Sequence, residues 1–231
     1  ERWQFVLFAF FFLFDSNHYV FFVYSNYYLI KINNYIYISL QMKEIKPNTF
    51  IFEFENAISQ QDCKTIIDLF EKNKDEHYQG KIGQNLEEDL NIKKSTDLFI
   101  SGKEGWKEVD KLFFSVLAKS LAILKKEIDF FQGPFKDMGY AIQRTEPGQF
   151  YHWHIDGGSH EFSYRQLVAI FYLNDMGKNQ GGETEFYHQN LSVSPSAGKL
   201  ILFPPFWTHK HRGTEVLSGK KYIATTWVVF A

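Results

Sequence analysis

Residues 138–173 read MGYAIQRTEPGQFYHWHIDGGSHEFSYRQLVAIFYL, and this stretch decides the fold class. It holds three short runs rich in aromatic and aliphatic residues, separated by a Pro-Gly and a Gly-Gly pair. Short apolar runs bounded by Pro and Gly predict strands joined by turns. Three further runs follow, so the predicted strands are 138–143, 149–154, 166–173, 184–187, 199–203 and 221–230. Many short strands with regular turn signals predict a sandwich or barrel.

The part of the chain before this β-rich half carries helical patterns. Ser59-Gln-Gln-Asp62 is a capping box, in which Ser59 accepts from the amide three residues on and Asp62 reaches back. Apolar residues at helical spacing then predict a helix to about Lys74 and a longer one over about 109–124. An alternating strand, 49–54, precedes both. We expect an α+β, mainly β fold: a double-stranded β-helix (jelly roll) core buttressed by amino-terminal helices.

Residues 1–41 differ from the rest in composition, because they are dense in Phe and Tyr and almost free of charge. A membrane span or a signal segment is one interpretation, although polar residues interrupt the apolar run and no cleavage site of small residues follows. An ordered part of the fold is another. We favour a third, non-native upstream translation with a start at Met42, because the bias is that of translated A+T-rich DNA. The chain thus divides into a non-core segment, 1–41, and a globular domain, 42–231.

Charge and cysteine content exclude several classes of protein. The net charge is −2, so there is no basic excess to bind nucleic acid. The single cysteine, Cys63, forms no internal disulfide and leaves no basis for a Cys-based zinc site. We therefore expect a cytoplasmic protein in a reducing compartment, associated with a membrane only if residues 1–41 are native.

Residues 151–156 read YHWHID, and this run is a candidate metal site. Side chains alternate faces along a strand, so His154 and Asp156 point the same way. A third ligand must come from elsewhere, and His209 and His211 are the candidates near the carboxyl terminus. Two His and one carboxylate on one face of an ion mark non-haem Fe(II) oxygenases. A His-x-Asp pair alone is also common among solvated polar residues.

The stretch from about residue 143 to residue 227 resembles the 2-oxoglutarate- and Fe(II)-dependent dioxygenases, in particular their prolyl 4-hydroxylase-like branch. That family carries His-x-Asp, then a distal His, then a basic residue ten positions later; His211 and Lys221 have this spacing, with Gly213 and Gly219 also in place. Further family motifs are Gly148-x-x-Tyr151-x-x-His154, Tyr172-Leu-Asn-Asp175, Gly181-Gly-Glu-Thr184 and Leu202-Phe-Pro204.

The resemblance implies a ligand set and a cofactor. His154, Asp156 and His211 would hold Fe(II), and Lys221 would meet the far carboxylate of 2-oxoglutarate. His209 then takes an outer or surface role, because the basic residue would lie twelve positions after it. O2 is the co-substrate, and ascorbate is the expected reductant.

The resemblance also implies further site residues and an activity. By analogy, Tyr172 would donate a hydrogen bond to the same carboxylate as Lys221, and Thr225 is another candidate for it. Residues 42–231 would form a dioxygenase that hydroxylates a C–H bond of a peptidyl or free amino acid, with proline as a candidate, and releases succinate and CO2. The partner is then a small molecule or a peptide.

One departure affects the substrate. The family often carries a tyrosine nine or ten residues before the first ligand, where this chain has Thr145 and Arg144. Arg144 and Arg165 are candidates to face the substrate instead. Two alternatives to a hydroxylase stay open: an inactive metal-binding jelly roll that serves as a binding or sensor module, and a zinc hydrolase, which leaves Lys221 without a role.

Overall fold

The chain divides into two compact units, Glu1–Ser39 and Leu40–Ala231. The computed structural model describes residues 22–24, 27–32, 35–38, 40–83, 85–129 and 131–231. In the first unit, β1 (Phe22–Tyr24), β2 (Tyr27–Ile32) and β3 (Tyr35–Ile38) form an antiparallel sheet. The interpretations of residues 1–21 lie outside the described residues. The boundary at residue 41 stays a prediction; Leu40 and Met42 both pack against the core of the second unit.

The second unit is mainly β, with helices before most of its strands. Its α-helices are α1 (Gln60–Lys72) and α2 (Lys107–Glu127). Its strands are β4 (Lys43–Glu44), β5 (Phe52–Phe54), β6 (Tyr78–Gln79), β7 (Thr96–Phe99), β8 (Phe135–Asp137), β9 (Ala141–Thr145), β10 (Tyr151–His154), β11 (Arg165–Tyr172), β12 (Thr184–Phe186), β13 (Leu191–Val193), β14 (Leu200–Phe203), β15 (His211–Gly213) and β16 (Lys221–Phe230). The predicted mainly β class is confirmed.

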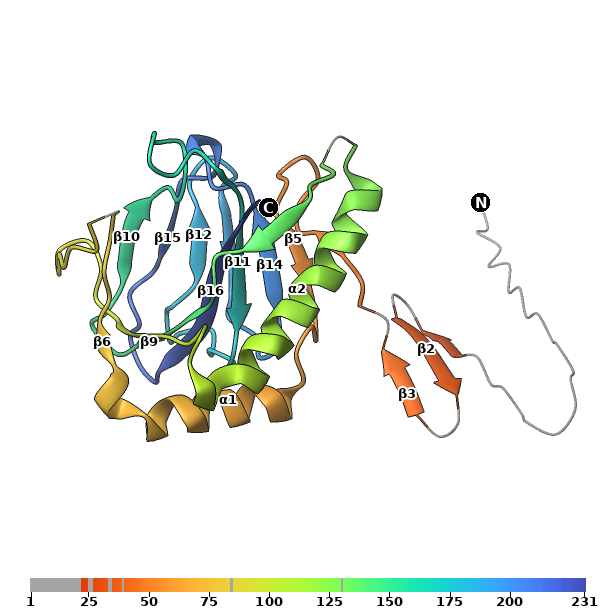
Figure 1. Ribbon diagram of the computed structural model, residues 1–231, viewed down its shortest axis with the longest axis horizontal. Helices are drawn as coiled ribbons and strands as arrows, with labels where there is room; N and C mark the ends of the chain where they lie inside the picture. Colours follow the sequence, from red (N-terminus) through yellow and green to blue (C-terminus); the bar gives the residue numbers. More distant parts are fainter. Residues whose placement is uncertain (1–21, 25–26, 33–34, 39, 84, 130) are drawn as a thin grey trace, which may run out of the picture. The chain divides into compact units, whose positions relative to one another are not determined.

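Two antiparallel sheets make up this unit. The larger runs β4-β5-β14-β11-β16-β9-β7-β6, with β8 paired to the end of β16. The smaller runs β10-β15-β12-β13. Figure 1 shows β10, β15 and β12 side by side, and α2 crossing the larger sheet on the diagonal.

The two helices form for reasons that the sequence contains. The Ser59 hydroxyl accepts from the Asp62 amide at 3.0 Å at the start of α1, as the capping box predicted. The Asp62 carboxylate reaches back to the Ser59 hydroxyl at 2.6 Å rather than to its amide. In α2 the chain turns extended at Ile128, which ends the helix. Within the described residues, neither helix has both the length and the hydropathy needed to cross a membrane.

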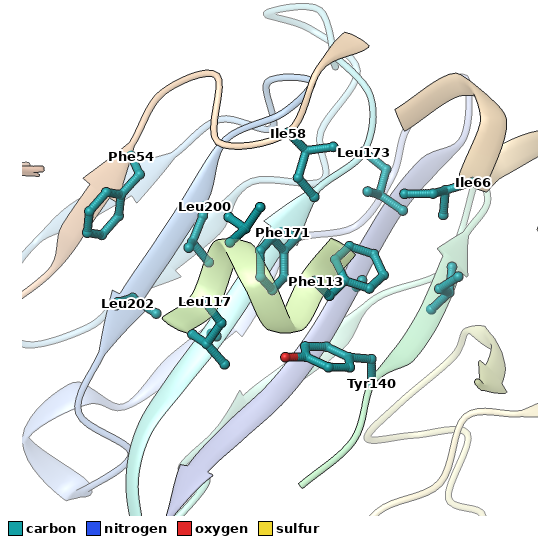
Figure 2. Close-up of a cluster of buried hydrophobic side chains, with 14 of the residues drawn as sticks. Phe54, Ile58, Ile66, Phe113, Leu117, Tyr140, Phe171, Leu173, Leu200 and Leu202 are labelled. Carbon is teal, nitrogen blue, oxygen red and sulfur yellow. The ribbon is translucent and has the colours of Figure 1, made fainter. Parts of the chain in front are cut away.

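The larger of two hydrophobic cores lies between the helices and the larger sheet. Phe113 and Leu117 of α2 point toward Phe171 of β11 and Leu200 of β14, as Figure 2 shows. Phe113 and Phe171 are fully buried, with ring centroids 4.9 Å apart. This core fixes the sheet from its helical side.

A second core lies on the opposite face of the larger sheet and positions the site. Ile170 and Tyr172 of β11 pack there with Phe186 of β12, which belongs to the smaller sheet. The alternation along β16 places Ile223 in this second core and Tyr222 in the first. Lys221 has the parity of Ile223, so it points between the two sheets.

Prediction and structure differ most for short strands. The run 221–230 is β16 as predicted, and 166–173 matches β11 within one residue at each end. Sequence patterns predicted neither β13 nor β15, and the His-Arg-Gly sequence of β15 has low strand propensity. Pairing on both sides, with β10 and β12, makes β15 a strand. This matters because β15 begins with His211.

Candidate metal centre

The pairing of β10 with β15 brings two histidines together. In this antiparallel register His154 lies directly opposite His211. Asp156 follows two residues after β10, and its amide donates to the Pro205 carbonyl at 3.0 Å, which holds the turn. The imidazole rings of the two histidines have centroids 4.2 Å apart. One register therefore joins residues that are far apart in the sequence.

His154, Asp156 and His211 form a compact cluster. One ligand atom from each residue lies within 4.8 Å of the others. The His211 Nε2 and an Asp156 carboxylate oxygen are 3.3 Å apart. Asp156 and His211 are buried, and His154 is half-buried. Separations of this size suit three atoms around one ion rather than three side chains bonded only to one another.

Backbone carbonyls orient both imidazoles. The Nδ1 of His154 lies 2.8 Å from the carbonyl oxygen of His152, and the Nδ1 of His211 lies 2.9 Å from that of His209. A carbonyl only accepts, so each Nδ1 carries the hydrogen and donates it. Each Nε2 then keeps its lone pair for a metal, which is the usual arrangement for a ligating histidine. His152 and His209 therefore act on the cluster through their carbonyls.

The side chain of His209 has a structural role. Its Nε2 lies 2.8 Å from the Thr49 carbonyl, and its Nδ1 lies 2.9 Å from the Thr208 hydroxyl. His209 is 4% exposed, so the surface position that we considered for it is wrong. With both ring nitrogens engaged, its imidazole has no free lone pair to offer a metal.

Electrostatics keep the cluster in the state that binds cations. Burial and the neighbouring His211 lower the pKa of His154 to about 3, against the opposing effect of Asp156. Burial acts to raise the pKa of Asp156, yet the neighbouring imidazoles of His211 and His154 hold it well below its usual range. At neutral pH the cluster therefore offers a neutral imidazole at His154 and a carboxylate at Asp156.

Lys221 is a buried cation between the sheets. It is 4% exposed, whereas Lys220 is exposed and pairs with Glu146 at 2.9 Å. Among the described residues, no carboxylate oxygen lies within 4.0 Å of the Lys221 Nζ. A Cβ added to Gly213, two residues after His211, would lie 3.8 Å from that Nζ. An ammonium group without a carboxylate partner beside the metal cluster suits an anionic ligand.

Of the two other predicted cofactor residues, Tyr172 lies near Lys221, and Thr225 lies four residues further along β16. The Tyr172 ring centroid is 6.0 Å from the Lys221 Nζ, and the Tyr172 hydroxyl donates to the Thr184 hydroxyl at 2.7 Å. Thr225 accepts from the Gln143 amide at 3.3 Å. Sequence reasoning did not identify Thr184 as a polar partner in this region, although Thr184 ends the Gly-Gly-Glu-Thr motif.

The two arginines that were candidates for substrate contact differ in position. Arg144 pairs with Glu71 at 2.7 Å and lies in register with Tyr222, whose side chain is in the helix-side core. The interpretation of Arg144 as substrate-facing is therefore wrong. Arg165 is buried, and its Nη1 donates to the Asp156 carbonyl at 2.7 Å.

The burial of Lys221 predicts a cost in stability. Burial lowers its pKa from 10.5 to about 8, while Glu183 opposes this shift. Between those two pH values the unfolded chain binds more protons, so stability rises with pH. We expect Lys221→Met to raise the free energy of unfolding at pH 7 by about 3 kcal/mol, at about 1.4 kcal/mol per pKa unit. Denaturant titrations at pH 7 and pH 10 measure this gain, which should shrink at the higher pH.

The matched control for this stability prediction is Lys220→Met. Its side chain is exposed, so the change should stay within about 0.5 kcal/mol. If Lys221→Met is less stable than the wild type at pH 7, the prediction that the buried charge of Lys221 lowers stability is wrong.

A hollow of about 470 Å³ lies away from the cluster. It is bordered by α2 and by Phe135, Lys136 and Asp137 of β8, and it shares no residue with the cluster. Its lining contains no histidine, so it does not offer the same metal chemistry.

The part of the chain that contains the motifs is similar to known oxygenases. Residues 140–229 match the model of the 2OG-Fe(II) oxygenase superfamily. Prolyl 4-hydroxylase 1 of Arabidopsis thaliana is 34% identical over 137 residues, covering 46% of this chain and 46% of that protein. A PKHD-type hydroxylase of Synechococcus sp. (strain CC9902) is 26% identical over 120 residues, covering 51% of this chain and 49% of that protein. The chain spans about half the length of the curated relatives it matches.

A solved structure supports the same fold. The viral collagen prolyl hydroxylase vCPH from Paramecium Bursaria Chlorella virus-1, in its 2OG complex, aligns with a TM-score of 0.63 at 20% identity. The alignment covers 81% of this chain and 100% of that one. In the matched residues and in its fold, the chain is similar to the class of 2-oxoglutarate- and Fe(II)-dependent oxygenases. Within that class, the chain is similar to the prolyl 4-hydroxylase-like branch, and the resemblance predicted from its motifs is confirmed.

Proposed function

We propose that the protein is an Fe(II)- and 2-oxoglutarate-dependent dioxygenase that hydroxylates a C–H bond. The observation that carries this proposal is the cluster of His154, Asp156 and His211, whose ligand atoms lie within 4.8 Å of one another. Two imidazole nitrogens and one carboxylate suit Fe(II), and they leave coordination positions for other ligands. Lys221 supplies the cation for a dicarboxylate co-substrate bound there.

The chain's own groups would position the reactants. Bound iron supplies the oxidation itself, in which O2 and 2-oxoglutarate yield succinate, CO2 and a hydroxylated product. His154, Asp156 and His211 hold the metal, and the ammonium group of Lys221 fixes the far carboxylate of 2-oxoglutarate. Tyr172 and Thr225 would donate hydroxyl hydrogen bonds to the same carboxylate. The Tyr172 hydroxyl would give up its bond to Thr184 to do so.

The remaining expectations fit this activity. The two packed sheets would form the jelly roll, with α1 and α2 buttressing it. The dioxygenase domain would comprise residues 42–231, in a cytoplasmic protein that uses ascorbate as reductant. The substrate would be a peptidyl or free amino acid, with proline as a candidate because relatives are named prolyl 4-hydroxylase and collagen prolyl hydroxylase.

The test is turnover with product detection. Purified protein receives Fe(II), 2-oxoglutarate, ascorbate and O2 together with pools of proline-containing peptides and free amino acids. We expect succinate release and a product heavier than its substrate by one oxygen atom in mass spectrometry. No succinate from any pool, despite iron binding, would favour the inactive binding module.

Zinc provides the second control. A zinc hydrolase with the same ligands would work with Zn(II) and without O2. We expect Zn(II) to inhibit, because it occupies the ligands without supporting the oxidation. Activity with Zn(II) in the absence of O2 would contradict the proposal.

A further inference from the structure

A buried ion pair lies beside β10, outside the metal cluster. The Lys93 Nζ is 2.7 Å from one Asp97 carboxylate oxygen, and the Ser95 hydroxyl donates to the other at 2.7 Å. The two charged side chains are 6% and 5% exposed. A buried ion pair is often no more stabilising than an apolar pair of the same size. Stability alone therefore gives little reason for it.

The backbone makes room for this pair. A Cβ added to Gly80 would collide with the Ser95 hydroxyl and lie 2.9 Å from the Lys93 Cε. The Gly80 amide also donates to the Ser95 carbonyl at 2.9 Å, so the two segments lie against each other. A side chain at position 80 would therefore force the Ser95 hydroxyl and the Lys93 side chain to shift.

The pair reaches the metal cluster through one aromatic ring. Lys93 forms an isolated β-bridge with Tyr151, and its Nζ is 5.3 Å from the centroid of the Tyr151 ring. That ring stacks on the imidazole of His154, with centroids 3.6 Å apart and planes 14° apart. The contacts thus run from Asp97 through Lys93 and Tyr151 to His154.

We propose that Lys93 and Asp97 are a positioning pair for the metal site: the Lys93 ammonium group, fixed by Asp97, holds the Tyr151 ring against His154. This inference rests on the proposed function, because it assigns the pair to the metal ligand His154. The His152 carbonyl fixes one edge of that imidazole, and the Tyr151 ring fixes its plane. Partners that orient a ligand typically change metal affinity about 10- to 100-fold when they are lost.

The test replaces the pair by apolar residues in the double variant Lys93→Met/Asp97→Leu. An apolar pair should keep the melting temperature near that of the wild type. Co(II), which absorbs visible light according to its coordination, is the probe. We expect the Co(II) dissociation constant to rise about 10-fold and the visible spectrum to change shape. A merely structural pair would leave both unchanged.

The matched control is Lys94→Met. The Lys94 Nζ is 5.5 Å from the Phe150 ring centroid, a similar contact beside a ring that is not stacked on a predicted ligand. This variant should bind Co(II) as the wild type does. An equal loss in Lys94→Met would overturn the inference, because any lysine on this segment would then have the same effect.

A second variant covers the case in which the double variant fails to fold. Tyr151→Leu removes the stacked ring and should reproduce the weaker binding and the altered spectrum; wild-type binding would overturn the inference. His154→Ala separates the two proposals, because it should abolish Co(II) binding. Equal binding by His154→Ala and the wild type would overturn the metal site itself. Wild-type binding by the double variant alone would overturn only the positioning pair.

Discussion

His211→Ala should reduce 2-oxoglutarate turnover by at least about 100-fold, the upper end of what loss of a ligand's orienting partner costs. The Nε2 of His211 is one of three ligand atoms in the cluster, and its Nδ1 is already committed to the His209 carbonyl. Among the described residues, no other His, Cys, Asp or Glu joins the group that can hold a metal, so nothing replaces it. Succinate release at saturating Fe(II) measures the loss.

His209→Ala is the matched control for this prediction. It removes the imidazole bonded to Thr49 but leaves the carbonyl that accepts from His211. We expect a loss of stability of about 1 kcal/mol and turnover close to that of the wild type. If His209→Ala is inactive and His211→Ala is active, the choice of ligand is wrong.

Lys221→Met should weaken the binding of 2-oxoglutarate about 10- to 100-fold, because a hydrogen bond to a charged group contributes about 1.5–3 kcal/mol to the binding free energy. The effect should fall on KM, while kcat at saturation changes little, since the far carboxylate does not react. KM should also rise above pH 8 in the wild type, because the pKa of Lys221 is lowered to about 8 by burial and the ammonium charge is lost above it. Initial rates against 2-oxoglutarate concentration at several pH values measure both effects.

Two variants frame this second prediction. Lys220→Met removes an exposed charge paired with Glu146, so its KM should match the wild type. Lys221→Arg keeps the cation and should recover part of the affinity. Equal KM values for Lys221→Met and the wild type would show that another group holds the carboxylate. A higher KM for 2-oxoglutarate in Lys221→Met, together with the predicted gain in stability, would show two effects of Lys221. The residue strengthens 2-oxoglutarate binding and lowers the free energy of unfolding.

The sequence predicted the local features of this site better than its assembly. Strand alternation sufficed to predict that His154 and Asp156 lie on one face. Because Lys221 has the same parity as Ile223, alternation also predicted that Lys221 is buried. The choice of His211 over His209 needed the spacing of a known family. The structure adds a physical reason, because both ring nitrogens of His209 are engaged elsewhere.

Other features depend on pairings that sequence patterns do not contain. The three-residue strand that begins with His211 exists because strands on both sides pair with it. The position of Arg144 follows from its register with Tyr222, which turns it toward Glu71 and away from the cluster. Sequence patterns do not predict the Lys93–Asp97 ion pair, because both residues lie in a polar stretch that is typical of a loop.

We expect one metal ion and 2-oxoglutarate to bind together at His154, Asp156, His211 and Lys221. Calorimetric titration of 2-oxoglutarate into the protein without O2, with and without Fe(II), tests it most directly. We expect one equivalent of 2-oxoglutarate to bind in the presence of Fe(II), with much weaker binding without the metal and weakened binding in Lys221→Met. Binding of the same strength with and without Fe(II), or no binding to protein that holds iron, would contradict it.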